Sequence, residues 1–210
     1  MKPVFILYAS GKRIWLDKAI KFYGGVYRHL KDTAPKKLLI CNPNNKVNFT
    51  MKTESSKILI TYYSWSGNTR YVAETIHNLI GGDLFEILPM NPYPDKYNDI
   101  VCLAKKEINA NFYPKLKNKI DLSQYDTVFI GSPNWWGTIT PIVRTFLYEH
   151  DLTGKKVIPF ITHGGGGSQN TIMDMAEQYN GDVEKNNGWV GYGNSTTGLK
   201  GWLESISFLE

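Results

Sequence analysis

KILITYYSWSGNTRYVAETIHNLI, residues 57–80, decides the fold because its hydrophobic pattern changes period halfway along. The run at 58–63 is apolar and aromatic and contains no turn residue, which is typical of a buried strand. From Arg70 onward the apolar residues recur at helical spacing, so a helix is expected to start at or just before Arg70. This single segment therefore predicts a strand, a polar turn and a helix in succession.

The polar turn between the strand and the helix is expected to bind an anion. Its six residues are Ser64, Trp65, Ser66, Gly67, Asn68 and Thr69. Unpaired N–H groups and the positive end of the helix dipole meet at a helix N-terminus, and hydroxyl and amide side chains add further donors. Gly67 permits a close approach of the backbone to a ligand or a positive φ. The alternative is an ordinary helix cap, with Thr69 as the capping residue and Ser66 in a plain turn.

The spacing of this turn narrows the kind of phosphate that it would hold. It lacks the G-x-x-x-x-G-K-(S/T) pattern of nucleoside triphosphate sites and the G-x-G-x-x-G pattern of pyrophosphate sites. Hydroxyls and amides suit one terminal phosphate monoester. The segment SWSGNT resembles the phosphate loop of the flavodoxin family, (S/T)-x-(S/T)-G-x-T, at every defined position. That resemblance implies flavin mononucleotide, FMN, as the cofactor.

The rest of the chain continues the alternation of strands and helices. Apolar runs predict strands at 83–88, 127–131, 157–162 and about 183–192, and helical periodicity predicts helices at 95–110, 142–148, 168–179 and 197–206. Such regular alternation is typical of a doubly wound α/β sheet. We therefore predict a flavodoxin-like fold with five parallel strands in the order 2-1-3-4-5 and helices on both faces. The short interval at 181–191 has no room for the loop inserted in long-chain flavodoxins, so the resemblance is to the short-chain type.

The loop after the third strand is expected to contact the flavin ring, since ligands of such sheets lie beyond the C-terminal ends of the strands. This loop, SPNWWGTITP at 132–141, contributes the candidate residues Pro133, Asn134, Trp135, Trp136 and Gly137. Adjacent side chains in a loop tend to point apart, so we expect Trp136 to stack on the ring, with Trp135 at its edge. The alternative is that one tryptophan is core and the other a surface anchor. The family resemblance implies that the backbone of Gly137 approaches the flavin N5 and changes orientation with redox state.

The loop after the fourth strand, THGGGGSQN at 162–170, contributes the candidate residues Thr162, His163, Gly164, Gly165 and Gly166. Consecutive glycines in ordered structure cost about 0.5–1 kcal/mol each relative to alanine. We therefore expect close backbone contact with the pyrimidine edge of a flat ligand; a flexible loop without a ligand is the alternative. His163 is expected either to bond the flavin or to orient the loop, and Ser168 to cap the next helix. The loop lacks the second aromatic of many flavodoxins, so the outer flavin face is expected to be more open.

The basic charge of the chain belongs to its N-terminal quarter. Residues 1–50 contain 10 Lys/Arg and 2 Asp/Glu, whereas residues 51–210 contain 14 and 17. The charge of the main domain therefore gives no support to nucleic-acid binding. No apolar run approaches 18 residues, so no transmembrane segment is expected. The two cysteines, Cys41 and Cys102, form no C-x-x-C pair, which favours a reducing cytoplasm and indicates neither a redox dithiol nor a metal site.

Residues 1–50 form a basic extension ahead of a flavodoxin-like domain at 51–210, and three interpretations compete. Apolar residues at helical spacing between 14 and 30 predict an amphipathic helix, which the glycines at 24 and 25 weaken. The segment is a small β-α-β addition, a basic helix that touches a membrane surface or a partner, or an upstream extension outside the native protein. In the third case the native chain starts at Met51, and the intact mass of the protein from its source would decide the matter.

Three functions are compatible with a bound FMN. The first is a one-electron carrier that serves a redox partner protein, although carriers of this family tend to be more acidic than residues 51–210. The second is a quinone or flavin reductase that admits NAD(P)H and a small acceptor in turn at an open flavin face. The third is an FMN-binding sensing module. No catalytic residue is predicted, because no Ser-His-Asp set, paired carboxylates or metal-ligand spacing is present, and the sequence carries no signal for an oligomeric state.

Overall fold

The computed structural model describes residues 57–179 and 188–209 with their side chains. Of the preceding part it describes the backbone of four strands, β1 (Ile6–Ala9), β2 (Lys12–Trp15), β3 (Leu38–Asn42) and β4 (Asn45–Phe49). These strands pair as two antiparallel hairpins, β1 with β2 and β3 with β4. The chain divides into two compact units, residues 1–53 and 54–210. Of the helix predicted between 14 and 30, the first two residues lie in β2 and the remainder lies outside the described residues.

The second unit is built on five parallel strands, as the alternation of apolar runs predicts. The strands are β5 (Ile58–Tyr62), β6 (Asp83–Glu86), β7 (Thr127–Pro133), β8 (Lys156–His163) and β9 (Trp189–Tyr192). Their order in the sheet is β6-β5-β7-β8-β9, which confirms the predicted order 2-1-3-4-5. The register aligns Ile60 with Phe129 and Phe129 with Ile158. From β5 the chain adds β6 on one side of the sheet and then β7, β8 and β9 on the other, so the strand order changes direction between β5 and β7. These two strands precede the first two candidate loops.

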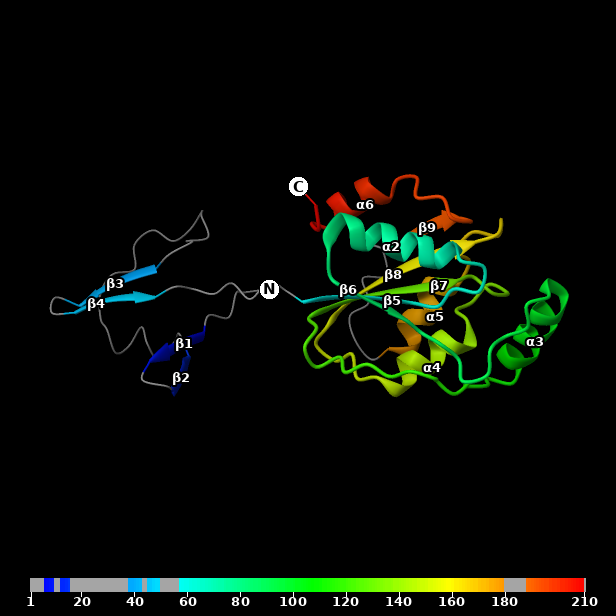
Figure 1. Ribbon diagram of the computed structural model, residues 1–210, viewed down its shortest axis with the longest axis horizontal. Coiled ribbons are helices and arrows are strands. Elements are labelled where there is room, and N and C mark those ends of the chain that lie inside the picture. Colours follow the sequence, from blue (N-terminus) through cyan, green and yellow to red (C-terminus); the bar gives the residue numbers. More distant parts are fainter. Residues whose placement is uncertain are drawn as a thin grey trace. The chain divides into compact units, whose positions relative to one another are not determined.

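Helices cover both faces of this sheet. They are α2 (Asn68–Ile80), α3 (Tyr97–Asn109), α4 (Pro141–Glu149), α5 (Thr171–Gln178) and α6 (Leu199–Ser205). In Figure 1, α2 and α6 lie on one face and α4 and α5 on the other, while α3 lies beyond the strand ends. Two buried clusters correspond to these layers: α2 and α6 contribute to one, and α3, α4 and α5 contribute to the other.

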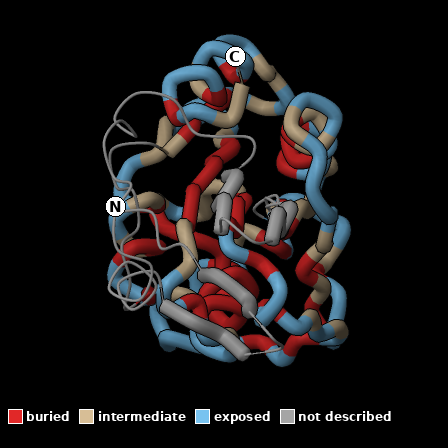
Figure 2. The backbone as a smooth tube through the Cα atoms, turned by 90° about the vertical axis from the view of Figure 1, so that its left-hand side faces the viewer, coloured by how far each residue is buried: buried red, intermediate tan, exposed pale blue. Residues whose placement is uncertain are grey.

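The central strand β7 is buried along both faces. Its first six residues are all buried, and Phe129 is fully enclosed. A continuous apolar run is what a parallel strand needs when helices cover both sides. In Figure 2 the buried segments form the interior of the unit and the exposed ones its outer turns. Burying one large apolar side chain contributes roughly 1.5–3 kcal/mol, so this double-sided core holds the strand ends, and the loops that leave them, in place.

Most element boundaries differ from the sequence prediction by a few residues. The helix α2 begins at Asn68, just before Arg70 as predicted, whereas α5 begins at Thr171 rather than at residue 168. Strand β6 ends at Glu86 rather than at 88, and β9 begins at Trp189, after the undescribed residues 180–187. A helix boundary depends on where the local backbone bonds are satisfied, and loop contacts alter that point.

The prediction that Ser168 caps α5 is wrong. The residue at the N-cap position is Asn170, and no side chain makes a capping hydrogen bond there. The backbone carbonyl of Ser168 accepts from Thr171 N–H at 2.9 Å, and Asn170 N–H donates to the carbonyl of Gly137 at 3.0 Å. A backbone bond from a distant loop thus supports the start of α5. Sequence position alone does not indicate such a tertiary bond.

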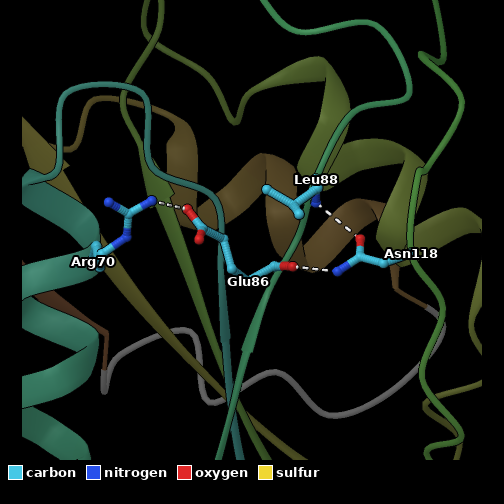
Figure 3. A network of polar contacts seen from close by, with 4 residues as sticks. All are labelled: Arg70, Glu86, Leu88 and Asn118. Atoms are coloured by element: carbon cyan, nitrogen blue, oxygen red, sulfur yellow. Dashed lines mark hydrogen bonds and ion pairs between the residues drawn. The ribbon is translucent and has the colours of Figure 1, made fainter.

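Side-chain contacts hold the C-terminal end of the edge strand β6 (Figure 3). Arg70 of α2 forms an ion pair with Glu86 at 2.5 Å. The Asn118 amide accepts from Leu88 N–H at 3.1 Å and donates to the Glu86 carbonyl at 2.7 Å, so that it continues the ladder past the strand. Arg70 lies in the first turn of α2, beside the predicted anion site, and its charge is paired with Glu86.

Candidate functional site

The three predicted loops meet at the C-terminal edge of the sheet. They leave the adjacent strands β5, β7 and β8, which run parallel and end on the same side. The hydroxyls of Thr69 and Thr162 lie 2.8 Å apart in a buried hydrogen bond, which joins the first loop to the third. Asn134 N–H donates to the carbonyl of Thr162 at 2.7 Å and joins the second loop to the third. Residues that are 28 to 93 positions apart are thereby held together.

The start of α2 has the features of an anion site. Gly67 occupies the N-cap position with φ +87°, a left-handed conformation that favours glycine. No side chain caps the helix and no acidic residue lies in its first turn, so the N–H groups and the positive end of the dipole are left for an external anion. Ser66 is exposed and Asn68 half-buried, so both side chains are within reach of a ligand at this turn.

Ser64 supplies the most specific observation in this turn. Its Oγ is buried and has no hydrogen-bond partner among the described residues. A buried hydroxyl without a partner costs about 1–3 kcal/mol, and such groups are rare in folded proteins. A phosphate oxygen at the start of α2 would accept its hydrogen bond. The residues present therefore fit a phosphate group without a lysine or arginine.

Two other residues of the turn serve the fold. Thr69 is 1% exposed, and its hydroxyl is already bonded to Thr162. The Trp65 ring packs against the core cluster and donates from Nε1 to the carbonyl of Pro94 at 2.9 Å. The alternative in which Thr69 caps the helix does not hold, because the N-cap is Gly67. The side chains of Trp65 and Thr69 instead fix the turn to the core of the domain.

The two tryptophans of the second loop have different surroundings. Trp135 packs edge-on against Tyr93 and Tyr63, with ring centroids at 5.1 Å and 5.7 Å. Trp136 is 53% exposed, and its Nε1–H donates to the carbonyl of Val101 on α3 at 3.1 Å. Edge-to-face contacts of the first kind are among the preferred packings of aromatic rings. Trp135 thus belongs to the core, and Trp136 presents its ring at the edge of the sheet.

A tight turn separates these two rings. Trp135 and Thr138 exchange two backbone hydrogen bonds of 3.1 Å, and the two central residues have positive φ, +54° at Trp136 and +88° at Gly137. Positive φ at both central positions is the pattern of a type I′ turn. A bulky residue in this conformation is uncommon and costs on the order of 1 kcal/mol or more. At Gly137 a Cβ would lie 2.3 Å from Gln169 Oε1, so the Gln169 side chain would have to move, and the φ of +88° itself favours glycine there.

Asn134 connects the second loop to the third. Its Oδ1 accepts from Gly137 N–H at 2.8 Å, and its Nδ2 donates to the carbonyl of Gly167 at 2.6 Å. Pro133, the residue before it, ends β7 opposite Thr162. One amide side chain therefore fixes the turn that carries Trp136 and the loop that contains the glycines.

His163 orients the glycine loop. Its Nδ1 accepts from Gly165 N–H at 3.0 Å, so the neutral imidazole carries its proton on Nε2. The Tyr192 ring lies 5.8 Å from the imidazole at 69°, and the two residues are paired in the sheet register. The glycines at 164, 165 and 166 are exposed. The structure places an aromatic ring from β9 beside this loop, which itself contains none.

A depression of about 300 Å³ lies between the second and third loops. Its lining residues come from both loops and are Asn134, Trp136, Gly137, His163, Gly164, Gly166 and Gln169. Six of these seven were candidates from the sequence. Gln169 was not, although it lies two residues after the glycine run, because its side chain reaches Gly137 only through the folding of the two loops. The volume of the depression lies at the lower end of the range of small-molecule pockets.

Buried aromatic hydroxyls and a carboxyl group lie beneath the second loop. The Tyr93 hydroxyl donates to Glu107 Oε2 at 2.7 Å. Burial raises the pKa of both Tyr93 and Tyr63 above the usual range of a phenol. Burial also raises the pKa of the Glu107 carboxyl, and the hydrogen bond from Tyr93 opposes this shift. These tyrosines stay protonated near neutral pH and act as packing and donor groups.

Metal binding and membrane insertion receive no support from the described residues. Among them, no group of three or more His, Cys, Asp or Glu side chains is arranged to hold a metal ion. In the same part of the chain, no helix has both the length and the apolar content to cross a membrane.

Known proteins share the fold of this chain. A family model described as Flavodoxin matches residues 57–206. A candidate flavoprotein of Bacteroides eggerthii DSM 20697 is 35% identical with a TM-score of 0.63, over 73% of this chain and 99% of its own. A candidate flavoprotein of Bacteroides uniformis ATCC 8492 is 28% identical with a TM-score of 0.63, over 72% and 99%. A flavoprotein of Lactobacillus acidophilus NCFM in complex with FMN is 26% identical with a TM-score of 0.58, over 70% and 99%. No curated protein sequence matches.

Proposed function

Because this chain belongs to the flavodoxin family, we propose that it binds FMN where the three loops meet and transfers electrons through the bound flavin. The observation that carries the proposal is the placement of the exposed Trp136 ring and the uncapped start of α2 on one edge of the sheet. A ring surface and an anion site are the two features that a flavin with a terminal phosphate needs.

The phosphate is held by the turn before α2. Ser64 donates its unpartnered hydroxyl, Ser66 and Asn68 add donors from the rim, and the first N–H groups of α2 point at the anion. Arg70 is engaged with Glu86 and leaves the phosphate to neutral donors. Binding by neutral groups makes the affinity only weakly dependent on salt, because no ion pair is screened.

The ring is held by the second and third loops. Trp136 stacks on the flavin, and the backbone of the glycine loop, which His163 orients, faces the pyrimidine edge. Bound FMN supplies the reversible transfer of one or two electrons. Asn134 keeps the Trp136 turn and the glycine loop at a constant separation, which lowers the ordering cost of binding.

A second candidate function is an NAD(P)H-dependent quinone or flavin reductase that uses the same FMN. The supporting observation is the third loop itself, whose glycines at 164, 165 and 166 are exposed and present no side chain, although the Tyr192 ring of β9 lies beside the loop. His163 also lines the depression, and with Nδ1 occupied as an acceptor its Nε2–H would be the donor for the oxygen of a small acceptor. We place either activity in the cytoplasm, since Cys102 is a free thiol in the described part of the chain.

One anaerobic experiment tests both functions. The full-length protein is loaded with FMN, mixed with NADPH or NADH, and followed by flavin absorbance. Slow bleaching, together with rapid reoxidation of the photoreduced protein by a one-electron acceptor, is expected of a carrier. Rapid bleaching with turnover on a quinone would establish the reductase instead. If the protein stays colourless and does not quench the fluorescence of added FMN, both proposals fail.

A further inference from the structure

The charge of the second unit is unevenly distributed. Residues 96–119 contain six lysines and two acidic residues, so this segment carries a net positive charge. The whole of 51–210 contains 14 Lys/Arg and 17 Asp/Glu. The remainder of this unit therefore has 8 basic and 15 acidic residues. We call the six lysines the basic strip; they are Lys96, Lys105, Lys106, Lys115, Lys117 and Lys119.

The fold brings this strip to the edge of the sheet that carries the candidate site. Lys105 and Lys106 lie on α3, which stands beyond the strand ends in Figure 1. The segment 115–117 runs antiparallel to 88–90, just past the C-terminal end of β6. Met90 N–H donates to the carbonyl of Lys115, and Lys117 N–H donates to that of Leu88, both at 2.8 Å. In this extended segment Leu116 points inward, and the lysines on either side of it are exposed.

The lysines of the strip are available to a partner. All six are exposed, and none forms an ion pair with a carboxylate among the described residues. Of the two acidic residues in the segment, Glu107 is engaged by the Tyr93 hydroxyl. Asp99 lies in the first turn of α3, where it interacts favourably with the helix dipole. The positive charge of the strip is thus not neutralised within this part of the chain.

The strip also contacts the residue proposed to cover the flavin. The Lys105 ammonium lies 4.5 Å from the centre of the Trp136 ring, and the same ring donates its N–H to Val101 of α3. A cation within about 6 Å of an indole face is attracted to it. The strip therefore begins beside the ring that we propose to stack on the flavin.

We propose that the basic strip is the docking surface for an acidic electron-transfer protein. This inference rests on the proposed electron-transfer function and names the chemistry of its partner. One electron passes from reduced FMN to an oxidised one-electron centre of the partner, so the flavin loses what the partner gains. Charge complementarity around an exposed redox centre raises the rate of productive encounter by 10-fold to 1,000-fold at low ionic strength, and salt removes this gain.

The test compares two protein acceptors of opposite charge, acidic cytochrome b5 and basic cytochrome c, by stopped-flow mixing with the photoreduced full-length protein. Three proteins are used: the wild type, Lys115→Glu/Lys117→Glu, and the control Lys57→Glu/Lys200→Glu. Both variants change the net charge equally. The control residues are exposed; Lys57 lies at the N-terminal end of β5, and Lys200 lies on α6, where it forms an exposed ion pair with Glu204. The basic residues 1–50 are constant throughout.

We expect the wild type to reduce cytochrome b5 faster at about 10 mM than at about 300 mM ionic strength, where the Debye length is much shorter. The strip variant should lose ~3–10-fold in this rate constant at low salt, beyond any change in the control. A wild type that prefers cytochrome c, or a strip variant equal to the control, would overturn the proposal. The flavin spectrum and dithionite reduction of each variant report separately on FMN binding, so failure of the proposed function is recognised independently.

Discussion

Trp135 and Trp136 differ in their surroundings although they are neighbours of the same kind. The positive φ of Trp136 turns its ring away from the aromatic cluster that holds Trp135 and toward α3 and the depression. Because the turn is closed by two backbone bonds, the rings cannot exchange places without breaking it. One residue therefore contributes to stability, and the other is left for a ligand.

Replacement of Trp136 separates these two roles. Trp136→Ala should weaken FMN binding by ~1–3 kcal/mol, since that is what an aromatic stacking partner of a base contributes, and should leave unfolding almost unchanged. Trp135→Ala should instead destabilise the fold by about 3–5 kcal/mol, because it leaves a cavity in the aromatic cluster. Fluorescence titration with FMN and urea unfolding measure the two effects. Unchanged FMN affinity in Trp136→Ala would show that another group stacks on the ring.

The unpartnered Ser64 hydroxyl permits a second test. Ser64→Ala should leave the stability of the FMN-free protein unchanged or slightly higher, because a buried group without a partner is removed. FMN affinity should fall by about 1.5–3 kcal/mol, the contribution of a hydrogen bond to a charged group.

Thr61→Val is the matched control for this variant. Its Oγ1 is likewise buried without a partner among the described residues, but it lies within β5 rather than in the turn. We expect higher stability and unchanged FMN affinity in this variant. Equal affinity loss in both variants would argue against a direct contact between Ser64 and the phosphate.

Among the elements, the loops after β7 and β8 behave as one unit because Asn134 joins them. The amide accepts from Gly137 and donates to Gly167, and the backbone of Asn170 adds a third connection through the Gly137 carbonyl. A ligand that lies against both loops meets a surface that is already formed. Such pre-organisation contributes to affinity by reducing the entropy lost on binding.

Two substitutions of Asn134 dissect this bridge. Asn134→Asp keeps an acceptor for Gly137 N–H but loses the donor to Gly167, whereas Asn134→Ala loses both bonds. We expect each lost bond to cost about 0.5–1.5 kcal/mol of unfolding free energy. Hydrogen exchange at the Gly137 amide should stay slow in Asn134→Asp and become fast in Asn134→Ala. Slow exchange in both variants would mean that the turn is held by other contacts. FMN should dissociate faster from each variant than from the wild type.

At the scale of the whole molecule, α3 links the core to the functional edge. It contributes Ile100 to the buried cluster, Glu107 to the hydroxyl of Tyr93, and Val101 and Lys105 to the Trp136 ring. The helix thus supports the aromatic cluster from one side and carries part of the basic strip on the other. A change in its stability should therefore affect both the site and the docking surface.

The Glu107 carboxyl on α3 is expected to make the stability of the fold depend on pH. Burial raises its pKa in the folded state, so the folded protein binds this proton more tightly than the unfolded chain does. At a pH where Glu107 is protonated in both the folded and the unfolded state, it has no effect on the free energy of unfolding. As the pH rises from the unfolded-state pKa, about 4.3, through the higher folded-state pKa, the free energy of unfolding falls. Glu107→Gln removes this loss and keeps an acceptor for Tyr93. Urea midpoints should agree at about pH 3.5 and favour the variant at pH 7; a wild type more stable at pH 7 would contradict this sign.

The local pattern of the chain predicted the secondary structure elements, and the resemblance to the flavodoxin family added their arrangement. Alternating apolar periods predicted the five strands and the helices, and the flavodoxin-like fold assignment added the strand order; the turn at 64–69, which we expected to bind an anion, lies at the uncapped start of α2. The strands and helices depend on residues within one or two turns of each other, so they are visible in a linear sequence. The boundary of α5 was missed because a bond from Gly137 supports it.

Only the tertiary structure showed which loop residues pack in the core and which are exposed at the candidate site. The separation of Trp135 from Trp136, the bridge from Asn134 to Gly167, and the approach of Lys105 to an indole 31 positions away all cross between elements. Such contacts depend on which strands lie side by side and on how far each loop extends beyond the sheet. They arise from packing geometry, because a side chain's neighbours in space are set by the whole core and not by its neighbours along the chain.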